Sequence, residues 1–278
     1  YKMQKTFALS LTVNPEKQAA IEIERLLKFP GFLKRDSFAK GRVEIVELRV
    51  DERSRLCNVA LSELNRVIKC RVLVCAVLRR GDVVAPDGSF VLREGDRIFV
   101  TASTEILATL LDNLGIITKK VNHVMICGGG RVSYYLAQQL EKDGMTVRLI
   151  EKDPKHCEEL AALLPKTEII NDDASNTFVL KRENIESCDA LVTATGMDEL
   201  NMIISLYGTK HGVSQVITKL GHMENGSMID QLPIGSTIWP KDLCCNGIVR
   251  YIRAMHNQTG AAVSVHSIAD GKAEAIEF

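Results

Sequence analysis

The chain has 278 residues, with 35 lysines and arginines against 35 aspartates and glutamates, so its formal net charge is zero. A neutral chain lacks the basic surface on which nucleic-acid binding depends, and we therefore exclude DNA and RNA as partners. The length is sufficient for two domains, and the longest apolar runs have the length of a strand, which excludes a membrane-spanning helix.

The first 118 residues predict a strand and a helix followed by a small α+β arrangement. The strand covers residues 7–13, and Asn14-Pro15 begins the helix, because proline fits the first helical position. Residues 43–50 alternate in part between apolar and charged side chains, which predicts a half-buried strand. Further strands are expected at 71–78, 83–84 and 97–101, and helices at 59–64 and 104–111, the last one capped by Ser103.

Residues 121–220 alternate between short apolar runs and amphipathic stretches. The predicted strands are 121–126, 146–150, 168–170, 190–194 and 216–219, and the helices between them are 132–142, 155–164, 176–183 and 199–211. Repeated β-α-β spacing indicates a doubly wound parallel sheet. The predicted fold class is therefore α/β, with a Rossmann-like sheet domain beside a small α+β module.

An internal repeat sets the domain organisation that we expect. The first copy consists of the pattern Thr12-x-x-Pro15, a helix and the strand after Gly41, and the second copy consists of Thr237-x-x-Pro240, a helix and the strand after Gly271. The helix starts lie 225 residues apart and the strands 230 residues apart. The predicted order is the final strand and crossover helix of a first, truncated sheet domain (1–35), a small module (41–118), a sheet domain (121–260) with its own crossover helix (240–256), and the start of a second, truncated small module (263–278).

A glycine-rich turn follows the predicted strand at 121–126. It reads Gly128-Gly129-Gly130-Arg131-Val132-Ser133, which is the dinucleotide-binding pattern G-x-G-x-x-G with serine at the third glycine position. Gly128 allows the tight turn, and Gly130 lets the backbone approach a pyrophosphate. The helix that begins near Arg131 and Val132 offers N–H groups to the phosphates, and the Arg131 side chain is a further phosphate ligand.

Polar residues follow the next strands along the chain. Glu151 ends the second strand 21 residues after Gly130, where an acid accepts hydrogen bonds from ribose hydroxyls, and Lys152 follows it. An acid at this place repels a 2′-phosphate, which favours NAD or adenosine nucleotides over NADP.

The third, fourth and fifth strands each supply candidates with two interpretations. Asp172 and Asp173 either line the adenine edge of the site or form an Asx turn and a helix cap. Thr195 and Asp198 lie at the carboxyl end of the sheet, where ligands bind, although Asp198 also suits a helix cap. Lys219 is either a phosphate ligand or a surface lysine.

The sequence indicates no catalytic or metal site. It contains no Tyr-x-x-x-Lys pair, no G-x-x-x-x-G-K-[ST] loop and no cysteines or histidines at zinc spacing. We therefore expect the nucleotide to be bound and not consumed. An NAD-dependent oxidoreductase, which would consume NAD, is one alternative.

Five segments together resemble the potassium-conductance-regulating (RCK or KTN) family. They are Ile126–Gly130, Leu149–Pro154, Leu56–Leu64, Arg79–Gly88 and Leu92–Arg97. The first two are similar to the nucleotide-binding module of the family (RCK_N), and the other three to its C-terminal module (RCK_C).

The resemblance implies a regulatory subunit and not an enzyme. Such a protein binds NAD(H) or ATP/ADP at the glycine turn and assembles as a homo-oligomer, a dimer that builds a ring, through its sheet domains and crossover helices. It lies in the cytoplasm, peripherally on the cytosolic face of the inner membrane. There the nucleotide changes the shape of the ring and gates a TrkH/TrkG-like membrane potassium transporter. A nucleotide sensor that regulates a non-potassium partner is the other alternative.

Overall fold

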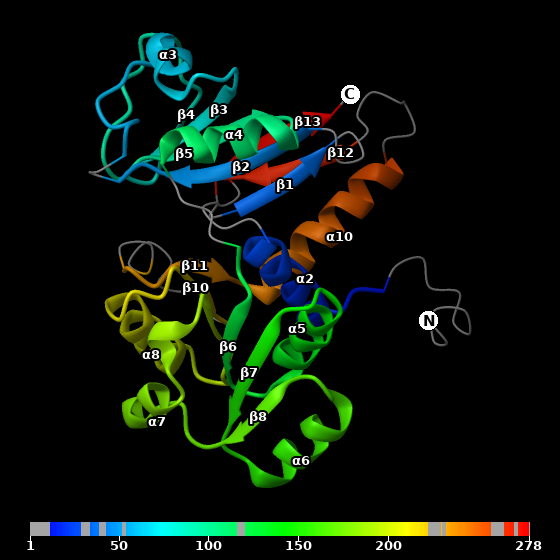
Figure 1. Ribbon diagram of the computed structural model, residues 1–278. Helices are drawn as coiled ribbons and strands as arrows, with labels where there is room; N and C mark the ends of the chain where they lie inside the picture. The colour runs from blue at the N-terminus through cyan, green and yellow to red at the C-terminus, as the bar shows by residue number, and fades with distance from the viewer. Residues whose placement is uncertain are drawn as a thin grey trace. The chain divides into compact units, whose positions relative to one another are not determined.

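The computed structural model describes residues 12–28, 34–38, 43–51, 54–115, 120–221, 229, 232–256, 264–269 and 272–277. The chain divides into two compact units, one from Tyr1–Glu24 and Val121–Tyr251 and the other from Arg25–Lys120 and Ile252–Phe278 (Figure 1). Of the strand predicted at 7–13, only residues 12 and 13 are described, and they are not in a strand. None of the helices in the described ranges has both the length and the apolar content that a membrane span requires.

The first unit contains a six-stranded parallel sheet. Its strands follow the order β11-β10-β9-β6-β7-β8, which is the doubly wound Rossmann order. Successive strands are added outward from β6 to β8 on one side and outward from β9 to β11 on the other. This confirms the predicted fold class. The strands are β6 (His123–Cys127), β7 (Thr146–Glu151), β8 (Glu168–Asn171), β9 (Ala190–Thr193), β10 (Gln215–Lys219) and β11 (Ser236–Ile238). Only β11, a strand of three residues, was not predicted.

Helices cover both faces of this sheet. Figure 1 shows α5 (Arg131–Lys142) and α6 (Pro154–Leu163) on one side, and α7 (Thr177–Arg182) and α8 (Asp198–Lys210) on the other. A short 3-10 turn, η3 (Ile185–Ser187), follows α7. The two remaining long helices both begin with proline, as predicted: α2 (Pro15–Lys28) and α10 (Pro240–His256).

Helix α8 lies close to the sheet. A Cβ atom at Gly208 would come within 2.3 Å of the Leu191 side chain on β9, so this buried side chain would have to shift to accommodate it. One turn earlier, the Ser205 hydroxyl lies 2.9 Å from Thr193 Oγ1 and accepts a hydrogen bond of 2.6 Å from Thr218 Oγ1. These buried hydroxyls satisfy one another, which is the condition for polar groups in a core.

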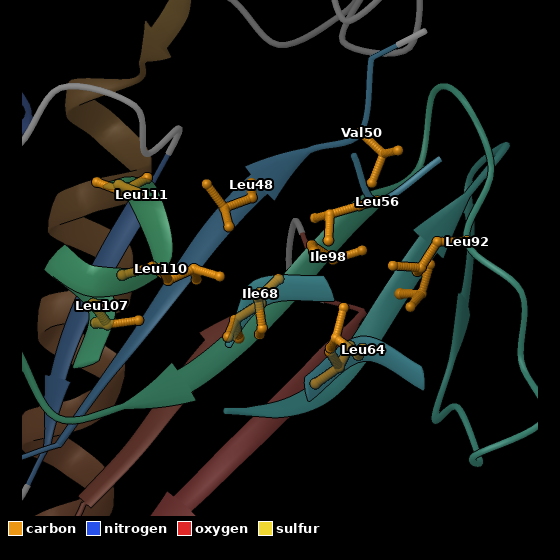
Figure 2. Close-up of a cluster of buried hydrophobic side chains, with 14 residues drawn as sticks. Leu48, Val50, Leu56, Leu64, Ile68, Leu92, Ile98, Leu107, Leu110 and Leu111 are labelled. Carbon is orange, nitrogen blue, oxygen red and sulfur yellow. The ribbon is translucent and has the colours of Figure 1, made fainter. Parts of the chain in front are cut away.

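The second unit is built on a five-stranded antiparallel sheet in the order β1-β2-β5-β3-β4. In Figure 2, leucines of helix α4 pack over β2 and β5, together with Leu64 and Ile68 of helix α3. The elements are β1 (Lys34–Phe38), β2 (Val43–Arg49), η2 (Leu61–Glu63), α3 (Leu64–Ile68), β3 (Leu73–Arg79), β4 (Asp82–Val84), β5 (Arg97–Ala102) and α4 (Thr104–Leu114).

Two predictions for the helices of the second unit need correction, and one of its strands was not predicted. The helix predicted at 59–64 is a 3-10 turn followed by α3, because residues 58–61 bond instead to the segment around Leu92. Ser103 occupies the N-cap position of α4, but its side chain makes no capping hydrogen bond. Strand β1, whose sequence is largely polar, was not predicted.

Strand β2 is buried on both faces, so the prediction of a half-buried strand was wrong. Its Glu44 and Glu47 are 5% and 2% exposed. The Glu47 carboxylate is paired with Arg97 of the neighbouring strand β5, which compensates for its burial. The second cover comes from a hairpin of β12 (Ser264–Ile268) and β13 (Ala273–Glu277), whose Ile268 packs with Ile45 of β2.

This hairpin has the same backbone pattern as the hairpin of β1 and β2. Lys34 pairs with Glu47 and Phe38 with Val43; likewise Ser264 pairs with Glu277 and Ile268 with Ala273. Every pair in the second hairpin lies 230 positions after its counterpart. The structures of the two hairpins thus support the internal repeat on which the predicted domain order depends.

The glycine at the contact between α8 and β9 allows a matched test of packing. We expect Gly208→Ala to destabilise the first unit by about 1–3 kcal/mol, because the added methyl group overfills a packed core. Gly247→Ala in α10 is the control: nothing lies within 4 Å of its added methyl group. There alanine should be neutral or stabilise by up to about 1 kcal/mol. Denaturant unfolding of both variants checks the difference, and equal effects would contradict it.

Candidate nucleotide-binding site

The glycine turn lies where the doubly wound sheet places its ligands. Strand β6 lies between β7 and β9, so the loops that follow β6 and β9 leave the sheet edge side by side. Gly128 has a φ of +99°, and a Cβ atom there would come within 2.8 Å of the Thr195 backbone. Glycine is therefore required at this position by both the backbone conformation and the contact.

The next glycine is held from both sides. The Gly129 N–H donates to Glu151 Oε2 at 2.7 Å, and its carbonyl oxygen lies 2.9 Å from His156 Nε2. A Cβ atom at Gly129 would come within 2.7 Å of the Leu160 side chain. The conformation of the turn is thus set by β7 and α6 as well as by its own glycines.

The turn then feeds into helix α5, whose first N–H groups have no acceptor within the helix. Gly130 is the N-cap residue, with extended backbone and no side chain over those N–H groups. The side chain of Arg131 is 79% exposed, whereas Val132 is buried, so Val132 can meet a ligand only through its backbone. Ser133 is fully buried, and its hydroxyl has no hydrogen-bond partner within the described residues.

Glu151 is oriented by two backbone donors. One carboxylate oxygen accepts from Gly129 N–H and the other accepts from Asp153 N–H at 2.9 Å. A carboxylate has about four acceptor positions, so capacity for two hydroxyl donors remains. An open N-cap beside an oriented carboxylate fits the pyrophosphate and ribose of a nucleotide, the first through helix N–H groups and the second through Glu151.

The aspartates after β8 form local turns. Asp173 accepts from Ser175 N–H at 2.8 Å, which is an Asx turn, while Asn176 and not Asp173 caps α7. Asp172 accepts from Asp173 N–H and from Arg182 at 2.9 Å, and these contacts lower its pKa. The Asx interpretation is therefore the one visible in the structure. Lys152 is exposed, and its charge adds to the hydrogen bonds from Ser175 that lower the pKa of Asp173.

The residues after β9 and β10 are joined by Asn201 of α8. This fully buried side chain accepts from the Thr195 N–H at 2.9 Å and the Thr195 hydroxyl at 2.7 Å, and it donates to the Lys219 carbonyl at 2.9 Å. Lys219 Nζ in turn donates to the Thr195 carbonyl at 2.7 Å. These hydrogen bonds link the ends of β9 and β10 directly to each other and through α8.

Asp198 belongs to the same cluster. It lies in the first turn of α8, after the N-cap residue Met197, so the interpretation of Asp198 as the helix cap was wrong. Its carboxylate instead accepts from Gly221 N–H at 2.8 Å. Burial lowers the pKa of Lys219, and the nearby Asp198 carboxylate partly offsets this effect. Lys219 is thus a half-buried cation at the carboxyl edge of the sheet and not a surface lysine.

Two residues of this arrangement were not predicted. His156 follows the Asp153-Pro154 helix start by one turn, and Asn201 follows Asp198 by three residues. In the sequence, each is one polar residue in an amphipathic helix. Asn201 and Ser205, spaced four residues apart between apolar neighbours, were a signal for a buried polar face.

Two domain families match the chain over most of its length. The TrkA-N domain matches residues 124–240 and the TrkA-C domain matches residues 45–115, which are the parallel sheet unit and the antiparallel sheet just described. The chain therefore contains a TrkA-C domain followed by a TrkA-N domain. Among curated relatives, it is 31% identical over 269 residues to the Trk system potassium uptake protein TrkA of Haemophilus influenzae, covering 96% of this chain and 57% of that protein.

A second TrkA relative matches most of the chain, and two solved structures share its fold. The TrkA homolog of Archaeoglobus fulgidus is 30% identical over 249 residues, covering 90% of this chain and 56% of that one. The chain thus spans little more than half the length of these TrkA proteins. The GsuK RCK domain matches with a TM-score of 0.62 and 16% identity, covering 94% of this chain and 55% of that one. The GsuK channel bound to NAD matches with a TM-score of 0.59 and 15% identity, covering 92% of this chain and 45% of that one.

Replacing Asn201 tests whether it holds the site together. Asn201→Ala leaves buried groups of Thr195 and Lys219 without partners, and we expect it to cost about 2–4 kcal/mol of unfolding free energy. Asn176→Ala, which removes an exposed helix cap, is the control and should cost about 1 kcal/mol. Denaturant unfolding measures both. Equal costs would show that Asn201 does not link the strands.

The contacts of His156 predict a pH dependence of stability. Its Nδ1 lies 3.1 Å from Glu159 and its Nε2 faces the Gly129 carbonyl, so both nitrogens face acceptors and the pKa is raised above 6.5, mainly by Glu159. A histidine whose pKa is raised in the folded state contributes to the free energy of unfolding. This contribution is fully present below pH 6.5 and is lost as the pH rises through the raised pKa. Because the pair is partly exposed, the contribution should be at most about 1 kcal/mol.

Unfolding free energies of the wild type and His156→Gln at pH 6 and pH 8.5 measure this contribution. The variant should be less stable than the wild type at pH 6, and the difference should shrink at pH 8.5. Glu159→Gln, which removes the main cause of the raised pKa, should reduce the pH dependence. A difference that is the same at both pH values would contradict the assignment.

Proposed function

We propose that this chain is the nucleotide-responsive part of a regulatory subunit for potassium uptake. The observation that carries the proposal is the hydrogen bond between Glu151 and Gly129, because it joins a ribose-type carboxylate to a phosphate-type glycine turn. The names of the TrkA relatives supply the potassium-uptake context. The RCK neighbours share the fold of the chain.

The ligand that we propose is NAD(H) or an adenine nucleotide such as ADP or ATP. The N–H groups at the start of α5, together with Arg131 and Lys219, would hold the phosphates, and Glu151 would hold the ribose. The 2′-phosphate of NADP would approach the Glu151 carboxylate, so NADP should bind more weakly. Lys152, Asp172, Asp173, Thr195 and Asp198 line the same edge of the sheet and would surround the remainder of the nucleotide.

The proposed role of the nucleotide is regulatory and not catalytic. Asn201 and Lys219 tie the strand ends at the site to one another, so a ligand that displaces one of these bonds changes the edge of the whole sheet. Such a change can gate a partner only if the nucleotide binds two states of the protein with different affinities. A bound nucleotide that is not consumed is sufficient for this mechanism.

The repeat supports a proposed assembly. Residues 1–35 would end a first sheet domain and residues 263–278 would begin a second small module, so that the full order alternates sheet domains and small modules. The crossover helices α2 and α10 would join copies into a homo-oligomeric ring. This ring would sit on the cytosolic face of the inner membrane and act on a TrkH/TrkG-like transporter.

Replacing Gly130 tests the nucleotide site without removing a structural contact. Gly130 is the N-cap residue of α5, and the nearest atom to an added Cβ is 4.0 Å away. Aspartate is a favourable N-cap residue, so Gly130→Asp should fold, but its carboxylate would repel the phosphates. We expect the NADH dissociation constant measured by calorimetry to rise at least about tenfold, since a direct charge repulsion costs more than 1 kcal/mol.

Gly130→Asn is the matched control, because asparagine also caps a helix but carries no charge. It should weaken NADH binding less than the aspartate does. Unchanged NADH binding by Gly130→Asp would show that the nucleotide binds elsewhere. Turnover of NADH with a small substrate would support an oxidoreductase instead. Rubidium uptake by cells that carry the variant in the full-length protein would test the link to potassium transport.

A further inference from the structure

Helix α2 places an acidic side chain beside the phosphate end of the proposed site. Glu16 Oε1 lies 3.3 Å from Nη2 of Arg131, the residue that directly follows the last glycine of the turn. The two residues are far apart in the sequence but lie in the same compact unit. The ion pair therefore connects the glycine turn to a helix that is otherwise no part of the Rossmann sheet.

The backbone that carries Glu16 is held firmly. Pro15 is the first residue of α2, and Asn14 caps the helix by accepting from the Lys17 N–H at 2.8 Å. One turn further on, Ala19 and Ala20 are fully buried and fix the position of the helix. A ligand at the glycine turn can thus rotate the Glu16 side chain, but it cannot readily move the helix away.

The two members of the ion pair differ in exposure, and the charge of Glu16 also acts on the Cys244 thiol of α10. Burial raises the pKa of the Cys244 thiol, and the charges of Cys245 and Glu16 add to that effect. The Glu16 side chain is 28% exposed, whereas that of Arg131 is 79% exposed. The arginine is therefore the freer of the two side chains to turn toward a ligand, whereas the less exposed carboxylate stays beside the start of α5.

Two consequences follow for a phosphate at the turn. It must compete with Glu16 for Arg131, and an exposed ion pair of this kind contributes at most about 1 kcal/mol, so the competition is easily won. The carboxylate then remains near the phosphate end and repels each additional negative charge. The repulsion increases with the number of phosphate groups in the chain of the ligand.

We propose that Glu16 is a specificity-determining residue that favours ligands with two phosphate groups, such as NAD(H) and ADP, over nucleoside triphosphates. This inference rests on the proposed nucleotide site. It assigns to α2 a role in selecting the ligand that is bound by the glycine turn of the following sheet domain.

The test compares Glu16→Gln with the wild type in calorimetric titrations of NADH, ADP and ATP, carried out with EDTA. Glutamine keeps the shape of the side chain and removes its charge. We expect the ratio of the ATP to the ADP dissociation constant to fall roughly three- to tenfold, as the loss of one nearby charge in a solvated site implies. Glu158→Gln removes the same charge from an exposed position of α6 and should leave the ratio unchanged.

An unchanged ratio in Glu16→Gln would overturn the proposal. So would weaker ATP binding by the variant when magnesium replaces EDTA, because the carboxylate would then hold a cation together with the triphosphate. If the proposed nucleotide site itself were wrong, the outcome would differ. The wild type would then bind none of the three nucleotides, or Gly130→Asp would bind them as tightly as the wild type does.

Discussion

The proposed site depends on one close approach between two loops at the sheet edge. The backbone at Gly128 lies against the backbone of Thr195, and a Cβ atom would close the gap to 2.8 Å. This contact fixes the turn after β6 relative to the loop after β9, on the two sides of the point where the strand order reverses. Glu151 then completes the arrangement from β7.

The polar residues around this contact form bonds to backbone as much as to one another. Glu151 bonds two N–H groups, Asn201 bonds groups of Thr195 and Lys219, and Asp198 bonds Gly221. Side chains that bond to backbone transmit displacement, because a ligand that alters such a bond moves the main chain of an element. Such a site would couple a bound ligand to the main chain, as the proposed regulatory function requires.

The sheets of the two units are covered on both faces, but by different kinds of element. The parallel sheet obtains both covers from helices that lie between its own strands in the sequence. The antiparallel sheet has helices α3 and α4 on one face, and residues of a hairpin more than 150 positions later pack on the other. Buried acids such as Glu47 are tolerated there because Arg97 of the adjacent strand neutralises the charge.

The sequence by itself determined what depends on neighbouring residues: the β-α-β alternation, the glycine turn, the place of Glu151 after its strand and the proline starts of α2 and α10. These features are local, because hydrophobic period and turn chemistry act over a few residues. The tertiary structure alone decided which residues meet from separate elements. It brought His156 to Gly129, Asn201 to Lys219, and Glu16 to Arg131, and it buried β2 beneath the β12–β13 hairpin. The hydrophobic periodicity or motif of one segment does not predict such contacts, because they stabilise the protein only when both segments are folded together.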